Sequence, residues 1–231
     1  MKKLITLLLS IALVFTVQVP IYAKIGQKSG AEDAITTDQS ETDLGLDVGG
    51  AYLIEAKTGK VLYAENEFSE ASPASVTKIM TLLLVCEALD AGKFGLNDMV
   101  TISEYAASMG GSQVFLEEGE RMSVEDLIKC TVIASANDAA VALAEHLCGS
   151  TDAFVAKMNE KAAALGLQNT HFTNPHGLHD DNHYTTAREL AIIAGEAMKN
   201  ATFRSIASTV KKTVTLQDGT VSRVLINHNR M

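Results

Sequence analysis

A long apolar run carries a single cation. Residues 73–89 are apolar at most positions, and Lys78 is the one cation among them. Ser72 is placed to cap this run and Pro73 suits a first helical position, so we expect a helix that continues to Leu89. Because apolar residues occupy nearly every side of it, this helix should be buried.

Helical signals recur through the middle of the chain. Ser123 and Asp126 resemble a capping box that opens a helix running through Val132. A glycine-rich loop with a short strand-like piece precedes it at 108–123. Further helices are expected at 135–147, 152–166 and 186–200.

Short apolar runs broken by turn residues lie on either side of these helices. They predict one hairpin at 51–67 with Gly59 in its turn, and another at 211–226 that turns at Asp218-Gly219. We therefore expect an α+β fold without internal repeats. In it, strands from both ends of the chain meet in one antiparallel sheet packed against a helical cluster.

The N-terminus has the order of a secretory signal peptide. Lys2 and Lys3 precede an apolar run from Leu4 to Val17, and Ile21-Tyr22-Ala23 follows, so we expect cleavage after residue 23. An uncleaved membrane anchor is the alternative, and the run is short for a bilayer span. Residues 24–47 are polar and predict a flexible leader, with the folded domain at 48–231.

Composition narrows the function classes. The chain of 231 residues is 47% hydrophobic and 20% charged, which is typical of a globular protein. Its formal charge of −9 becomes −11 once Lys2 and Lys3 are removed, and nucleic acid is not an expected partner. Three cysteines favour unpaired buried thiols, although a Cys130–Cys148 bridge stays open.

Ser75 and Lys78 have the spacing of a nucleophile and its base. Residues three apart on a helix face the same side, and burial disfavours the ammonium form of lysine. A neutral Lys78 amine would take the proton of the Ser75 hydroxyl. The helix start adds a backbone N–H for an oxyanion. The alternative is a lysine that reaches to water beside an unrelated serine.

Ser135 and Asn137 form a second candidate pair at the start of a later helix. The Ser135 hydroxyl would relay a proton, and the Asn137 amide would hydrogen-bond a substrate amide. The alternative is that one of the two only caps the helix.

The two pairs together resemble a known family. Ser75-Val76-Thr77-Lys78 and Ser135-Ala136-Asn137 match the S-x-x-K and S-x-N motifs of penicillin-binding proteins and serine β-lactamases. The stretches PASVTKIMT, SANDAAVALAEHLCGS, FTNPHGL and YTTARELAIIA resemble the low-molecular-mass D-alanyl-D-alanine carboxypeptidases. The likeness runs from about Val48 to the last residue.

The resemblance implies a β-lactamase/transpeptidase-like fold and an enzyme outside the cytoplasmic membrane, at the cell wall or the membrane's outer face. It would remove the terminal D-alanine from peptidoglycan stem peptides and be acylated by β-lactams, with no cofactor and no metal. Ser75 would form the acyl-ester, Lys78 would accept its proton, and Ser135 and Asn137 would supply the second motif. The resemblance also implies peripheral membrane association through a C-terminal region that is missing from this sequence.

The third family motif, Lys-Thr-Gly on a later strand, is not found after Ser135. The Lys-Thr-Gly at 57–59 precedes Ser75 and fits the first hairpin turn. We therefore expect a fragment that lacks C-terminal strands. In the family, the strand that carries this motif supplies one of the oxyanion N–H donors. Because the loss of one such donor lowers turnover by about 10²–10³-fold, this chain alone should be inactive or nearly so.

Further residues are compatible with different functions. His176, His179 and His183, with Asp180 and Asp181, have a spacing compatible with zinc. Glu117 or Glu118 would be a deacylation base if the protein were a β-lactamase. A non-catalytic peptidoglycan-binding remnant is the rival from a different functional class.

Overall fold

A computed structural model describes residues 44–215 and 222–227 of the chain. The predicted signal peptide and residues 24–43 of the predicted leader lie outside this part, and they stay predictions. The described chain begins without regular structure and enters its first strand at Ala51. Within the described ranges, no helix combines the length and the apolar character needed to cross a bilayer.

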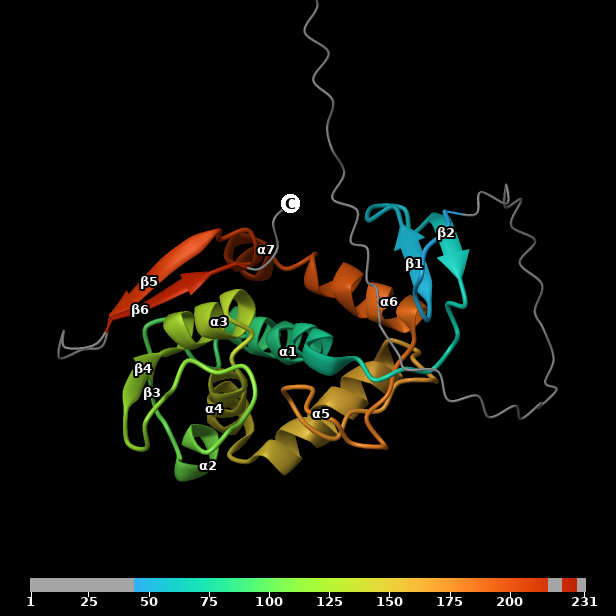
Figure 1. The fold of residues 1–231 in the computed structure, drawn as a ribbon. Helices are drawn as coiled ribbons and strands as arrows, with labels where there is room; N and C mark the ends of the chain where they lie inside the picture. The colour runs from blue at the N-terminus through green and yellow to red at the C-terminus, as the bar shows by residue number, and fades with distance from the viewer. Residues whose placement is uncertain (1–43, 216–221, 228–231) are drawn as a thin grey trace, which may run out of the picture.

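The predicted central helix is present, and it begins with a tighter turn than expected. A 3₁₀ turn, η1 (Ala74–Thr77), leads into α1 (Lys78–Asp90), and Pro73 precedes the turn. No side chain caps this start, so the expectation that Ser72 caps the helix was wrong. Helix α1 contacts α3, α4, α5, α6 and α7, which explains its apolar residues on nearly every side (Figure 1).

Helices α3 to α7 pack around α1, and α2 packs on α4. Ser123 accepts a hydrogen bond from the backbone N–H of Asp126 at the start of α3, so the predicted cap is confirmed. Two short helices, α2 and α7, were not predicted. The bounds are α2 (Glu104–Ala107), α3 (Val124–Ile133), α4 (Asn137–Cys148), α5 (Thr151–Ala164), α6 (Ala187–Ala197) and α7 (Ala201–Ala207).

The strands form three separate antiparallel pairs in the described chain. These are β1 (Ala51–Ile54) with β2 (Val61–Glu65), β3 (Met99–Thr101) with β4 (Arg121–Ser123), and β5 (Lys211–Thr215) with β6 (Ser222–Ile226). Both predicted hairpins are confirmed in their strands, and the predicted turn at Asp218-Gly219 lies outside the described residues.

The two terminal hairpins do not share a sheet, which corrects the expectation that they meet. Strand β1 packs on α6, whereas β5 and β6 pack on α3. Figure 1 accordingly places the two hairpins on opposite sides of α1. Each hairpin buries its apolar face on a different helix, so the α+β class holds while the single sheet does not.

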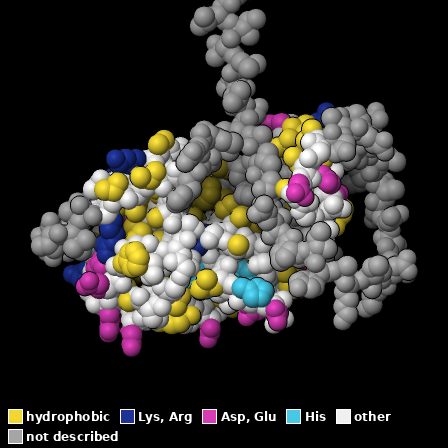
Figure 2. All heavy atoms as spheres, in the orientation of Figure 1, with side chains coloured by type: hydrophobic (Ala, Val, Ile, Leu, Met, Phe, Trp, Pro, Cys, Tyr) yellow, Lys and Arg dark blue, Asp and Glu magenta, His cyan; other side chains and the backbone are white. Residues whose placement is uncertain are grey.

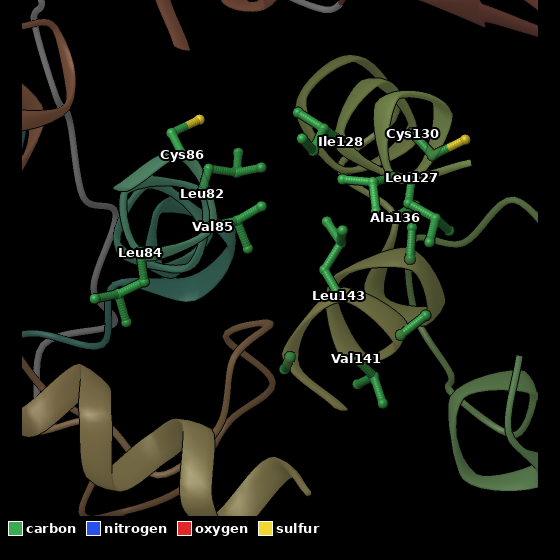
Figure 3. Close-up of a cluster of buried hydrophobic side chains, with 14 of the residues drawn as sticks. Leu82, Leu84, Val85, Cys86, Leu127, Ile128, Cys130, Ala136, Val141 and Leu143 are labelled. Carbon is green, nitrogen blue, oxygen red and sulfur yellow. The ribbon is translucent and has the colours of Figure 1, made fainter. Parts of the chain in front are cut away.

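The core lies between α1, α3 and α4. In Figure 3, Leu82 and Val85 of α1 point toward Ile128 of α3 and Leu143 of α4. Surface apolar side chains gather over the region of the β5–β6 hairpin in Figure 2.

The three cysteines are free thiols, so the Cys130–Cys148 bridge is not formed. Cys86 and Cys130 are buried, as expected for unpaired thiols, and Cys148 is half-buried. Burial raises the pKa of the Cys86 and Cys130 thiols to about 12, which keeps both protonated at neutral pH.

Truncation of Leu83 should destabilise the folded chain, because this side chain lies in the core around α1. The side chain is 1% exposed, so Leu83→Ala should lower the free energy of unfolding by about 2–5 kcal/mol. Leu62→Ala is the matched control, because Leu62 is 55% exposed on β2 and should change stability by about 0.5 kcal/mol or less. Urea unfolding followed by circular dichroism measures both, and equal effects would contradict the central place of α1.

Candidate active site

Ser75 and Lys78 meet at the start of α1. The Lys78 amine lies 3.2 Å from the Ser75 hydroxyl oxygen and 2.7 Å from the backbone carbonyl of His176. Lys78 is 3% exposed, whereas Ser75 lies at the surface. The alternative of a lysine reaching to water is therefore wrong, and the pair presents an accessible hydroxyl above a buried amine.

The surroundings of Lys78 shift its protonation equilibrium toward the neutral amine. Burial lowers its pKa to about 8, and the negative charge of Asp138 opposes part of this shift. A neutral amine has a lone pair that accepts a proton from a hydroxyl at hydrogen-bonding distance. The geometry and the pKa together make Lys78 a suitable base for Ser75.

The backbone before Ser75 has an unusual conformation, held by a distant loop. Ala74 has a φ of +45°, which is uncommon for a residue with a side chain. Gly177 packs against it so closely that a Cβ on Gly177 would lie 1.8 Å from the Ala74 carbonyl oxygen. Only glycine fits this contact, so the loop that carries His176 also supports the turn that carries Ser75.

Further hydrogen bonds fasten this loop to the same helix. The Thr81 hydroxyl donates to the Pro175 carbonyl at 2.6 Å. His183 Nδ1 accepts from the Thr173 N–H at 3.0 Å, so its Nε2–H donates to the Thr77 hydroxyl at 2.7 Å. The loop between α5 and α6 thus lies along the first turns of α1.

The second candidate pair lies at the start of α4. Ser135 has a φ of +56° and precedes the helix, and Asn137 is its first residue. No side chain caps this start, so the alternative of a simple helix cap is wrong for both residues. Ser135 is half-buried, and no hydrogen bond within the described chain joins its hydroxyl to Lys78 or Ser75.

Asn137 is held on one side and left with a free acceptor on the other. Its side-chain N–H₂ donates to the Gly110 carbonyl at 2.7 Å, and its backbone N–H donates to the Ser112 carbonyl at 2.7 Å. Its side-chain carbonyl oxygen is buried and has no partner among the described residues. An acceptor fixed in this way is suited to receive an N–H from a bound molecule.

The histidines do not assemble into the zinc site considered from the sequence. His176 and His183 are buried, and each uses a ring nitrogen to accept a backbone N–H. His179 is exposed and lies 3.4 Å from the carboxylate of Asp181. Within residues 44–215 and 222–227, no group of three or more suitable side chains is placed to hold a metal ion.

The candidate β-lactamase glutamates and the early Lys-Thr-Gly stretch have ordinary surface positions. Glu117 and Glu118 are exposed in the loop before β4. The Lys-Thr-Gly at 57–59 lies in the exposed turn between β1 and β2, as expected. There the Glu55 carboxylate accepts hydrogen bonds from the backbone N–H and the hydroxyl of Thr58.

Sequence reasoning missed Asp138 and the His176 carbonyl. Asp138 is fully buried and accepts backbone N–H bonds from Val114 and Leu116. A lone acid at the start of the apolar stretch DAAVALA was a signal that could have marked it, because buried carboxylates need partners. Backbone carbonyls such as that of His176 leave no such mark in a sequence.

Comparison with known proteins settles the family. Residues 36–231 match the family model described as D-alanyl-D-alanine carboxypeptidase. This chain belongs to that family. It is 44% identical over 232 residues to the D-alanyl-D-alanine carboxypeptidase DacF of Bacillus subtilis, which covers 100% of this chain and 56% of that protein. It is 42% identical over 159 residues to DacA of Escherichia coli K12, covering 66% of this chain and 39% of that protein.

Solved structures of the family have the same fold. The D-alanyl-D-alanine carboxypeptidase DacD of Francisella tularensis superposes with a TM-score of 0.72 at 34% identity, covering 80% of this chain and 44% of that one. Penicillin-binding protein 5 of Haemophilus influenzae gives 0.71 at 37% identity, covering 77% and 51%. The predicted transpeptidase-like fold is confirmed, and the chain spans about half the length of these relatives.

Two buried histidines should make the fold sensitive to acid. Burial lowers the pKa of His176 and of His183 from 6.5 to about 4. Between these values the unfolded chain binds protons that the folded chain does not, so the free energy of unfolding should fall as pH drops from 6.5 toward 4. Above pH 6.5 this contribution is fully present.

Urea unfolding across that pH range measures the effect. His183→Gln keeps a donor for Thr77 and should flatten the slope, whereas His179→Gln changes an exposed ring and should leave it intact. A slope that is the same in all three proteins would contradict the assignment.

Proposed function

We propose that the protein is a serine-type D-Ala-D-Ala carboxypeptidase that forms an acyl-enzyme on Ser75. The observation that carries this proposal is the buried Lys78 amine within 3.2 Å of the Ser75 hydroxyl. The family supports the substrate class, because the relatives named above are D-alanyl-D-alanine carboxypeptidases. They also do not favour the β-lactamase alternative.

The first step transfers the acyl group. Lys78 takes the proton of the Ser75 hydroxyl as the oxygen bonds to the carbonyl carbon of the penultimate D-alanine. Ser75 lies in the first helical turn, where backbone N–H groups have no acceptor within the helix, so its N–H is available to the developing oxyanion. Collapse of the tetrahedral intermediate breaks the C–N bond, and the leaving D-alanine amine takes up the proton.

The second motif acts on the leaving group and on the substrate backbone. We assign to Ser135, next to the α4 start, the relay of the proton from Lys78 to the departing amine. The described chain has no hydrogen bond between Ser135 and Lys78, so the relay requires the two groups to approach each other in the substrate complex. The unpartnered carbonyl oxygen of Asn137 accepts an amide N–H of the stem peptide and fixes its direction. Water then attacks the ester carbonyl, the Ser75 oxygen recovers its proton, and the shortened peptide leaves.

We infer from this chemistry that the protein acts outside the cytoplasm. Its substrates are peptidoglycan stem peptides that end in D-Ala-D-Ala, and β-lactams mimic them as acylating inhibitors. The predicted signal peptide at 1–23 agrees with export to the cell wall or the outer face of the membrane.

Acylation by penicillin tests the nucleophile directly. Intact-mass analysis after long incubation should show one added penicillin on the wild-type chain and none on Ser75→Ala. A mass shift detects even slow acylation, so it suits a chain of low turnover. An unmodified wild type would overturn the proposal, and stem-peptide binding without acylation would favour the non-catalytic peptidoglycan-binding alternative.

The pH dependence of acylation tests the base. With a Lys78 pKa of about 8, the acylation rate should rise about tenfold per pH unit below 8 and level off above it. Lys78→Arg keeps the cation and removes the base, so its acylation should be too slow to detect. A rate that does not change between pH 6 and pH 9 would exclude Lys78 as the base.

A further inference from the structure

The loop from Gly110 to Leu116 is the direct support of Asn137. Both hydrogen bonds that Asn137 donates end on its carbonyls, at Gly110 and at Ser112. Gly111 allows the close approach, because a Cβ there would lie 2.9 Å from the Asn137 side-chain nitrogen. The direction of the unpartnered Asn137 oxygen therefore depends on where this loop lies.

A buried anion holds the inner side of the loop. Asp138 accepts the backbone N–H groups of Val114 and Leu116, each at 3.1 Å, and that of Ala139 at 2.9 Å. It is 0% exposed, and backbone N–H groups are its partners. These bonds satisfy the buried carboxylate and fix the loop against the start of α4.

A cation from the far end of the chain holds the same residues from the other side. Arg223 of β6 donates to the Val114 carbonyl at 2.7 Å and to the Phe115 carbonyl at 2.9 Å. Glu120 binds the same guanidinium through both carboxylate oxygens, at 2.8 and 3.0 Å. The loop peptides thus lie between an anion that takes their N–H groups and a cation that donates to their carbonyls.

We propose that Arg223 is a positioning residue for Asn137, acting through the loop from Gly110 to Leu116. The proposal rests on the proposed function, because it assigns the orientation of the substrate-binding amide to the β5–β6 hairpin. The guanidinium is planar and its donors are fixed in direction, so it orders two carbonyls and one carboxylate at once. Its removal takes the guanidinium donor from the Val114 and Phe115 carbonyls, while Glu120 keeps the backbone N–H of Glu117. The loop is then freer to move, and Asn137 moves with it.

Arg223→Gln is the test variant, and Arg121→Gln is its matched control. Arg121 is exposed on β4 and makes no hydrogen bond to the loop among the described residues. The Arg121→Gln substitution therefore removes the same charge from the same region without removing a loop contact. The measurements on purified chain are the dissociation constant of the pre-covalent penicillin complex, the limiting acylation rate, the melting temperature and amide hydrogen exchange at 114–116.

For Arg223→Gln we expect the dissociation constant to rise about tenfold, while the limiting acylation rate stays within about twofold. Exchange at the Val114 and Leu116 amides should quicken, and Arg121→Gln should match wild type. Arg223→Lys should recover only part of the affinity, because an ammonium cannot bind all three partners.

Two results would overturn the proposal. One is unchanged affinity and exchange in Arg223→Gln. The other is a rise in the dissociation constant matched by an equal fall in the limiting acylation rate, together with a large fall in melting temperature. A merely structural role would produce that result. If the wild type itself is not acylated, the proposed function fails. Amide hydrogen exchange at 114–116 then tests whether Arg223 holds the loop, and unchanged exchange in Arg223→Gln would show that it does not.

Discussion

The structure depends on a lysine amine kept away from water beside a serine hydroxyl. An ammonium loses much of its hydration when it is buried, so a site of this kind exists only where the fold supplies other partners. Lys78 has the Ser75 oxygen, the His176 carbonyl and the charge of Asp138. These partners hold the amine in place without fully restoring the stability of its charged form, and its pKa stays below the usual range.

The position of α1 produces that burial. Helices on several sides cover its apolar residues, and the same packing closes over the one cation in its first turn. Ser75 belongs to the 3₁₀ turn before α1 and remains at the surface. A short change in helix type therefore separates an exposed hydroxyl from a buried amine, although the two side chains are only three residues apart.

Buried carboxylates organise the two loops that complete the site. Asp138 gathers the N–H groups of the loop before β4. Glu189, which is 3% exposed, does the same for the loop after α5 by accepting the N–H groups of Gln168 and Asn169. In each case, a charge at the first turn of a helix fixes an irregular segment that would otherwise hold unsatisfied backbone groups.

Local features of the site and fold could be predicted from the sequence, and distant ones could not. The pairing of Ser75 with Lys78 follows from helical spacing, and both terminal hairpins follow from alternation and turn residues. The strands β3 and β4 have three residues each, too few for a periodic pattern. The contacts of Lys78 with His176 and of Arg223 with Val114 join residues 98 and 109 positions apart, which no local pattern encodes.

The unpartnered oxygen of Asn137 shows why a supported amide suits a binding site. A buried acceptor without a donor costs about 1–3 kcal/mol, so the side chain would turn to find a partner if it were free to do so. Its N–H₂ group is bound to Gly110, and its backbone is bound to Ser112, so it stays where it is. An incoming N–H would satisfy this oxygen without any movement of the side chain, which is why we propose Asn137 as a binding residue.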